Sequence, residues 1–166
     1  MVLFYTLTLL KNFLRIGFIP SAGRNFMGQI CIRHRGGALK RRKYYVDFFR
    51  RINLIGYIIK IQKTPFYTGN LGLIIYQNGL SNYLLLAEDL YIGDRIYIGT
   101  ALLKDKDFFY KKIGSAIPLS YISLFSKIHN LELYPFKGGQ LARAAGTSVI
   151  VSSKTLDCTM LKVKSG

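Results

Sequence analysis

Residues 71–87 read LGLIIYQNGLSNYLLLA, and this stretch decides the class of fold. Two apolar runs, 71–76 and 83–87, flank the dipeptide Asn78-Gly79, which is typical of a tight hairpin turn between antiparallel strands. The stretch lies in the longest uncharged part of the chain, Thr64–Ala87, but polar residues, glycines and a proline interrupt that part too often for a membrane-spanning helix. We therefore expect antiparallel β-structure and no membrane span.

The sequence on both sides of this hairpin follows the same pattern. Short segments rich in β-branched and aromatic side chains alternate with Gly, Asn, Asp and Pro. They predict an all-β chain built as one or two small barrels of the OB or SH3 type, preceded by a short amphipathic helix within residues 1–22 that ends near Gly17 and Pro20. The expected strands are Gln29–Arg33, Tyr44–Asp47, Gly56–Gln62, Leu71–Tyr76, Tyr83–Ala87, Arg95–Gly99, Lys127–Leu133, Thr147–Ser152 and Thr159–Val163.

The charge of the chain is strongly positive and unevenly distributed. Lys and Arg number 24 against 8 Asp and Glu, a net charge of +16, although half of the residues are apolar. Residues 24–63 hold eleven basic residues and one acid, whereas residues 64–110 are nearly neutral and residues 111–166 are again basic. A folded core with a cationic surface is expected of a protein that binds a polyanion. The same combination excludes disordered basic tails and ordinary neutral enzymes.

The first basic segment contains two clusters of cations separated by two glycines. It reads RHRGGALKRRKYY over residues 33–45. Like charges at this density repel one another unless a counter-charge is present, so phosphate binding is favoured over a merely solvated loop. Gly36 and Gly37 let the backbone turn tightly and approach another chain closely, while Tyr44 and Tyr45 offer either a stacking face or a core contact.

The second basic segment is dominated by small residues and reads KGGQLARAAGT over residues 137–147. A backbone with so few large side chains suits close packing against a ribose-phosphate surface. The segment contains neither a Walker A pattern nor a dinucleotide fingerprint, so it does not indicate a nucleotide cofactor.

Catalytic and metal-binding residue types show no arrangement that supports an enzyme. Cys31 and Cys158 are far apart and belong to no CxxC motif, so two free thiols, buried or partly buried, are expected rather than a disulfide or a zinc site. His34 lies in the basic loop, and His129 lies within an expected strand, where a hydrogen-bonded structural role is favoured over catalysis. The acids of residues 88–94 occupy turn positions, where they cap or are solvated.

A series of short motifs follows one order along the chain. Residues 23–25, 28–30, 33–37, 40–42 and 46–48 read GRN, GQI, RHRGG, KRR and VDF. Further on, residues 117–119 read IPL, residues 129–133 read HNLEL, and the second basic segment completes the series. Together they resemble the ribosomal protein L2 family, the universal RNA-binding proteins of the large ribosomal subunit, over nearly the whole of residues 23–166.

The resemblance implies a division of the chain into three parts. Residues 1–22 would be an N-terminal apolar or amphipathic extension. Residues 23–118 would hold the basic segment and an OB-type RNA-binding barrel, which begins near residue 28. Residues 119–166 would form an incomplete SH3-like barrel.

The resemblance also implies the partners and the contact residues. The expected partners are large-subunit ribosomal RNA near the peptidyl-transferase region and neighbouring ribosomal proteins, with no small-molecule substrate. No catalytic residue, metal or cofactor is expected, although Mg²⁺ can accompany the RNA. The expected RNA-binding residues are Arg24, Asn25, Arg33, His34, Arg35, Gly36, Gly37, Lys40, Arg41, Arg42, Lys43, Arg50, Arg51, Lys137, Gly138, Gly139, Gln140, Arg143 and Thr147.

Two departures from the family pattern lead to further expectations. The turn within residues 64–70 lacks the Arg that is typical of the family, and Tyr67 lies there instead, which puts a phosphate contact at this turn in doubt. In the family, residue 166 would lie inside the SH3-like domain. A second polypeptide carrying the C-terminal half is therefore expected to complete the barrel by pairing near Thr159–Val163.

The composition indicates the compartment, and the motifs indicate the function. A chain rich in Phe, Tyr, Ile, Lys and Asn and poor in Ala is typical of an AT-rich organellar genome, so a mitochondrial ribosome is expected, with a plastid ribosome as the second choice. The favoured function is a structural constituent of the large subunit that supports assembly and translation and has no activity as an enzyme. The alternative is a free-standing OB-fold protein that binds single-stranded nucleic acid, and a membrane-surface role of the N-terminal helix is a third hypothesis.

Overall fold

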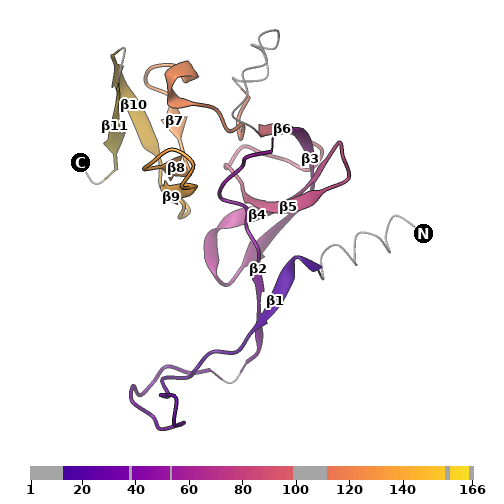
Figure 1. Cartoon of the computed structure of the whole chain (residues 1–166), viewed down its shortest axis with the longest axis vertical. Helices are drawn as coiled ribbons and strands as arrows, with labels where there is room; N and C mark the ends of the chain where they lie inside the picture. The colour runs from indigo at the N-terminus through magenta and orange to yellow at the C-terminus, as the bar shows by residue number, and fades with distance from the viewer. Residues whose placement is uncertain (1–12, 38, 53, 99–111, 156–157, 165–166) are drawn as a thin grey trace. The chain divides into compact units, whose positions relative to one another are not determined.

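The computed structural model describes residues 13–37, 39–52, 54–98, 112–155 and 158–164 (Figure 1). The chain divides into two compact units, one ending at Tyr45 and the other beginning at Val46. The expected helix falls largely on residues 1–12, which lie outside the described residues. The expected domain boundaries after residues 22 and 118 stay predictions.

The first unit is a two-stranded ribbon that closes a long loop. Strand β1 (Arg15–Phe18) pairs antiparallel with β2 (Arg41–Tyr44), and Figure 1 shows the loop between them extending beyond the ribbon. The prediction that the helix continues to Gly17 is wrong, because residues 15–18 are extended. Their backbone groups find partners in a strand more than twenty residues away in the sequence, and this pairing outweighs a weak local helical pattern.

The prediction of a strand over residues 29–33 is also wrong. Only one isolated bridge, between Arg24 and Ile30, is present here, and the backbone N–H groups of Cys31 and Ile32 both donate to the carbonyl of Gly23. The Asn25 side chain accepts hydrogen bonds from the backbone of this loop, which offers the backbone an alternative to a strand ladder. The expected strand over residues 44–47 is likewise displaced, since β2 ends at Tyr44.

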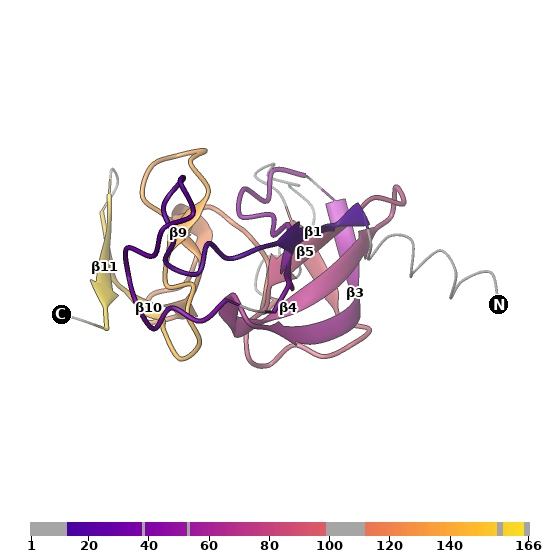
Figure 2. The same ribbon diagram turned by 90° about the horizontal axis from the view of Figure 1, so that it is seen from below.

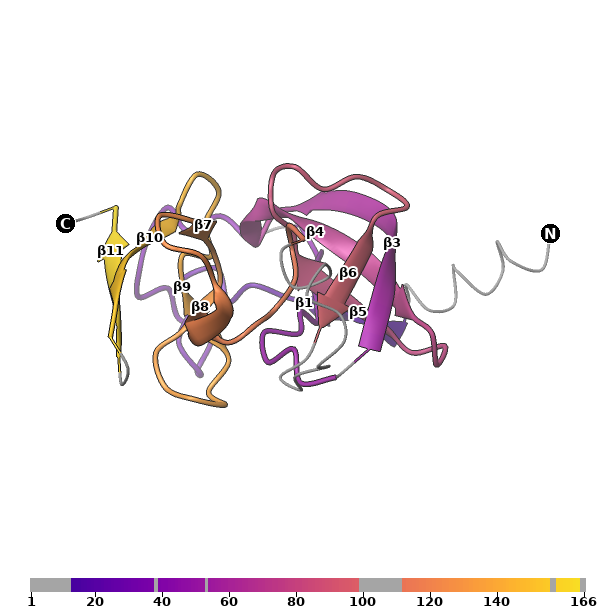
Figure 3. The same ribbon diagram turned by 90° about the horizontal axis from the view of Figure 1, so that it is seen from above.

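The second unit begins with a curled antiparallel sheet. Its strands are β3 (Leu54–Thr64), β4 (Tyr67–Tyr76), β5 (Ser81–Leu85) and β6 (Arg95–Ile98), in the spatial order β5-β4-β3-β6. Figure 2 and Figure 3 show these strands bending around a common interior as a half-barrel. The hairpin predicted at Asn78-Gly79 is confirmed, since β4 and β5 pair on either side of it and Gly79 has φ +83°.

The hydrophobic core of this sheet comes from the inward side chains of its strands and from two leucines that follow β5. The buried cluster consists of Ile58, Ile74, Tyr76, Leu84, Leu86, Leu90, Ile96 and Ile98. Gly56 is required where β3 crosses the core, because a Cβ there would collide with Ile74 Cγ2. The core therefore determines which face of β3 and β4 points outward.

The rest of the second unit is a set of short strands. They are β7 (Lys127–Ile128), β8 (Leu131–Glu132), β9 (Gly139–Leu141), β10 (Val149–Lys154) and β11 (Thr159–Val163), with a 3-10 turn η1 (Leu119–Tyr121) before them. They form a sheet of order β11-β10-β7 and a separate pair β8-β9 (Figure 1). The continuous strand predicted over residues 127–133 is broken at Asn130, where φ is +54°. The strand predicted over residues 147–152 begins at Val149, because Thr147 lies in a turn.

The all-β class predicted for the chain is confirmed. In the described ranges, no helix has the length and apolarity needed to cross a bilayer.

Candidate nucleic-acid interface

Hydrogen bonds to the side chain of Asn25 fix the conformation of the loop between β1 and β2. Asn25 Oδ1 accepts hydrogen bonds from the backbone N–H groups of Met27 (3.0 Å) and Gln29 (2.9 Å). The backbone N–H of Gly28 donates to the Asn25 carbonyl at 3.1 Å. Asn25, expected to contact RNA, therefore also shapes the loop that presents its neighbours.

Gly36 and Gly37 turn the chain tightly, as expected. Their φ values are +63° and +121°, and a Cβ on Gly37 would lie 2.6 Å from the Cβ of Ala22. The close approach that Gly37 permits is thus to another part of the same loop. Gly36 faces open space. Of the two glycines, it is therefore the one at which another chain could approach the backbone closely.

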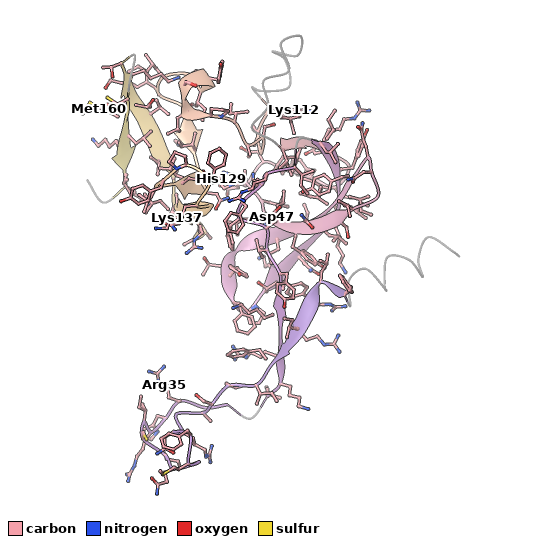
Figure 4. All side chains as sticks on the ribbon, in the orientation of Figure 1. Arg35, Asp47, Lys112, His129, Lys137 and Met160 are labelled. Atoms are coloured by element: carbon pink, nitrogen blue, oxygen red, sulfur yellow. The ribbon has the colours of Figure 1, made fainter. Side chains whose placement is uncertain are left out.

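The cations of the first unit from Arg24 to Lys43 are all exposed, whereas Arg15 is half-buried. Figure 4 labels Arg35 among the side chains of the loop. A surface of this kind can neutralise several phosphates at once, because none of its charges is sequestered in a core. The exposed residues among the expected contacts are Arg24, Arg33, His34, Arg35, Lys40, Arg41, Arg42 and Lys43.

In the second unit, Asp47 holds the segment that carries two neighbouring arginines. Asp47 Oδ1 accepts from the backbone N–H groups of Phe49 (3.0 Å) and Arg50 (3.1 Å). Its Oδ2 accepts from Asn82 Nδ2 at 3.2 Å, which ties the segment to β5. This turn directs Arg50 and Arg51 to opposite environments.

Arg50 is buried, which corrects the expectation that it contacts RNA. Only 7% of its surface is exposed; its Nη2 donates to the carbonyl of Leu85 at 2.7 Å and its Nη1 to the carbonyl of Gly114 at 3.1 Å. Burial lowers the pKa of Arg50 from its ordinary value, and the nearby Tyr76 and Asp47 partly offset this. A guanidinium keeps its charge over the physiological range. Arg50 therefore acts as an internal cross-link.

The second basic segment is held in place by Glu132. Its Oε2 accepts from the backbone N–H of Phe136 at 3.2 Å, and its Oε1 accepts from that of Gly138 at 2.9 Å. The N–H of Gly139 donates to the carbonyl of Phe48 at 3.0 Å. The turn is thus attached to the segment that follows Asp47.

Gly138 and Gly139 are buried, so they serve packing more than direct contact with a partner. Gly138 has φ +83°, and a Cβ on Gly139 would collide with the Asn130 side chain. Gln140 is half-buried in β9. Thr147, by contrast, is exposed and closes a turn by donating from Oγ1 to the carbonyl of Ala144 at 2.6 Å.

Three exposed cations of the second unit each lie over an aromatic ring. Arg51 Cζ is 4.8 Å from the centroid of the Phe49 ring, and Lys137 Nζ is 5.0 Å from that of Tyr134. Arg143 Cζ lies 5.0 Å from the centroid of Phe48. A ring beneath a cation restricts its side chain and costs less desolvation than a carboxylate partner, so the charge stays available to phosphate. Arg51 Nη2 also donates to the carbonyl of Phe136, the neighbour of Lys137, so the fold brings these two expected contacts to the same turn.

Tyr67, at the segment where a phosphate contact was in doubt, is the first residue of β4 and follows the turn at residues 65–66. The centroids of the Tyr67 and Phe48 rings lie 6.2 Å apart, and Phe48 in turn lies beneath Arg143. Thr68, next to it, accepts a hydrogen bond at Oγ1 from the backbone N–H of Ala145 at 3.0 Å. The start of β4 thus contacts the second basic segment, through Thr68 directly and through the Tyr67 and Phe48 rings.

His129 is a structural histidine beside the Arg50 cross-link. Figure 4 labels His129 in the second unit, where it is half-buried. Burial lowers the pKa of His129, the charge of Arg50 lowers it further, and a hydrogen bond with the backbone of Leu85 raises it in part. The imidazole is therefore neutral in the folded protein at neutral pH.

Sequence reasoning missed the residues that position the contacts. Glu132, Thr68 and Asp47 bind backbone N–H groups rather than a ligand. One signal was available for Glu132, since it is one of only two acids within residues 111–166. An acid retained in so basic a region, immediately before a glycine-containing turn, indicates a local structural role.

The cysteines and the metal-ligand types add no second site. Cys31 and Cys158 are free, but both are exposed, which corrects the expectation that they are buried. In the part of the chain that the structure describes, no three His, Cys, Asp or Glu side chains are grouped in a way that could hold a metal ion.

Known protein families match the chain along most of its length. A family model described as the RNA-binding N-terminal domain of ribosomal proteins L2 matches residues 16–98, and one described as the C-terminal domain of the same proteins matches residues 112–166. The large ribosomal subunit protein uL2c of Helicosporidium sp. subsp. Simulium jonesii is 40% identical over 157 residues, which cover 94% of this chain and 52% of that relative. The chain thus spans about half the length of this curated relative.

Arg50 and Arg51 should respond differently to the same substitution. Arg50→Ala leaves the carbonyls of Leu85 and Gly114 without their charged donor, so the free energy of unfolding should fall by about 3 kcal/mol or more. Arg51→Ala, the matched control, removes an exposed side chain and should cost less than about 1 kcal/mol. Urea denaturation of the two variants measures both values, and equal losses would contradict the cross-link.

The neutral His129 should make the fold sensitive to mild acid. Because the pKa of His129 is lowered in the folded state, the unfolded chain takes up a proton first, at about its ordinary value of 6.5. Stability should therefore be highest well above that pH and should decline as the pH falls through about 6.5, from the neutral into the mildly acidic range. His129→Gln should flatten this decline, and His34→Gln, which changes an exposed imidazole, should leave it as it is. Urea midpoints across this range measure the slope, and an unchanged slope in His129→Gln would refute the assignment.

Proposed function

The chain belongs to the ribosomal protein L2 family, and on that premise we propose that it is a structural, RNA-binding constituent of the large ribosomal subunit. Family models cover both basic segments, and a relative that matches 94% of the chain is a large-subunit protein. In this role the chain supports subunit assembly and translation near the peptidyl-transferase region, beside neighbouring ribosomal proteins. It acts by binding and has no catalysis or cofactor of its own, while Mg²⁺ accompanies the RNA.

The observation that carries this proposal is the exposure of the predicted contact cations. Apart from the buried Arg50, every Lys and Arg among them is exposed. The chain has only 8 acids for its 24 basic residues, so most of this charge needs a counter-charge from outside. Phosphates supply it at the density that such a surface requires.

A free-standing OB-fold protein that binds single-stranded nucleic acid is the alternative. The curled sheet of β3–β6 would permit it. This alternative gives no reason for the match of residues 112–166 to the C-terminal domain of ribosomal proteins L2. The ribosomal role accounts for both halves of the chain.

For the compartment we propose an organellar ribosome. The composition favours an AT-rich genome, and the chloroplast-type relative uL2c supports a plastid ahead of the mitochondrion that the composition first suggested.

The second polypeptide expected near Thr159–Val163 stays a prediction. What supports it is that β11 forms the outer edge of the sheet β11-β10-β7 within the described ranges, a position that can accept a further strand.

Purified organellar ribosomes test the compartment and the edge of β11 together. Mass spectrometry should detect this chain in large subunits from plastids and not in those from mitochondria.

A density map of the same particles should show a strand paired with Thr159–Val163. Solvent along that edge would refute the strand addition, and a strand from this same polypeptide would refute the second chain.

Reversal of charge at β2 should block incorporation into the large subunit. Arg41→Glu with Arg42→Glu replaces two exposed cations with anions, which phosphates repel. Lys60→Glu with Lys63→Glu makes the same change of charge on β3, outside the predicted contacts, and should leave incorporation near normal. Quantitative mass spectrometry of gradient-purified large subunits measures the occupancy. Normal occupancy of the β2 variant, or equal loss in both, would contradict the interface.

A further inference from the structure

Phe136 combines two properties that the stability of the fold does not explain. Its φ is +65°, in the left-handed region where a bulky side chain is strained and a glycine is not. Its side chain is 65% exposed, so burial of the ring offsets little of the free-energy cost of the strained backbone. Strain without compensating packing makes Phe136 a candidate for a functional role, and its contacts with neighbouring residues decide whether it has one.

The strained backbone of Phe136 is held from both sides. Its N–H donates to Glu132 Oε2 at 3.2 Å, and its carbonyl accepts a hydrogen bond from Arg51 Nη2. The next turn is fixed by the bond from the N–H of Gly138 to Glu132 Oε1. These bonds hold the turn in one conformation, so little conformational entropy is lost when a ligand meets the ring.

Two further exposed rings, Phe49 and Tyr134, belong to the segments that these bonds join, and we call Phe49, Tyr134 and Phe136 the ring cluster. The Phe49 ring packs against Gly138, where an added Cβ would lie 3.2 Å from its Cδ1. Arg51 lies over Phe49 and Lys137 over Tyr134. Each of these two rings thus has a cation over one face, and both rings remain more than half exposed.

We propose that the ring cluster stacks on unpaired bases, so that this face of the protein binds single-stranded RNA segments in preference to A-form duplex. The inference rests on the proposed function and deepens it. Bases inside a duplex are already stacked on one another, whereas splayed bases offer a free face to an aromatic ring. Arg51 and Lys137 lie where the flanking phosphates would pass.

The charge of the surface favours RNA over a protein as the occupant. A protein partner would have to desolvate the cations that accompany the rings. Glu132 is the only acid within residues 132–143, and its two oxygens already accept backbone hydrogen bonds. An anionic partner with flat, apolar faces fits the cations and the exposed aromatic rings of this surface.

The test is Phe136→Gly in the full chain, with Phe125→Gly as the matched control. Phe125 is also exposed and also has a positive φ, +61°, but it lies before β7, outside the ring cluster. Both substitutions remove a ring and relieve backbone strain, so neither should lower the urea midpoint of unfolding. Fluorescence anisotropy is measured with a labelled single-stranded RNA of mixed sequence and with a duplex of the same sequence.

Phe136→Gly should weaken binding of the single strand by about 5- to 150-fold and leave duplex affinity and the salt dependence nearly unchanged. Phe125→Gly should bind both probes like the wild type. Equal loss on both probes, no loss on the single strand, the same loss with Phe125→Gly, or a lowered urea midpoint in Phe136→Gly would each overturn the inference. So would unchanged RNA affinity in a variant that no longer joins the large subunit, since that result points to a protein partner.

Failure of the broader function is distinguishable from failure of this inference. Wild-type protein with no measurable affinity for either probe would overturn the proposed RNA binding and the stacking with it. Wild-type protein that binds both probes, alongside a Phe136→Gly variant that binds them equally well, would overturn the stacking alone.

Discussion

The guanidinium of Arg50 connects three separate segments of the second unit. It donates to the carbonyl of Leu85 at the end of β5 and to that of Gly114, while Asp47 holds the backbone from which it extends. These bonds satisfy buried carbonyls that would otherwise lack a partner, and they oblige the neighbouring side chains of the same turn to point elsewhere. The exposed positions of Phe49 and Arg51 follow from the burial of Arg50.

The surface that results from this arrangement depends on local preorganisation. Glu132 gathers the N–H groups of Phe136 and Gly138, and the N–H of Gly139 reaches the carbonyl of Phe48. In this surface the cations Arg51, Lys137 and Arg143 lie over aromatic rings. A charge that lies over a ring keeps most of its attraction for phosphate, because the ring, unlike a carboxylate, carries no net negative charge.

The sequence predicted most successfully what depends on short-range pattern. The hairpin at Asn78-Gly79 and the strands on either side of it follow from turn chemistry and alternating apolar residues. The same reasoning failed at residues 15–18, because their strand exists only through pairing with distant residues, and at residues 29–33, because the Asn25 side chain diverts the backbone. Local pattern does not reveal either cause.

The amino-acid sequence by itself determined the β class, the two basic segments and the family, since each of these resides in composition, turn residues and ordered motifs. It could not distinguish Arg50 from Arg51, two identical side chains at adjacent positions of a basic stretch. Only the tertiary structure decided that the first is a buried cross-link and the second an exposed contact. The physical reason is that the carbonyls which bind Arg50 come from residues 35 and 64 positions away along the chain.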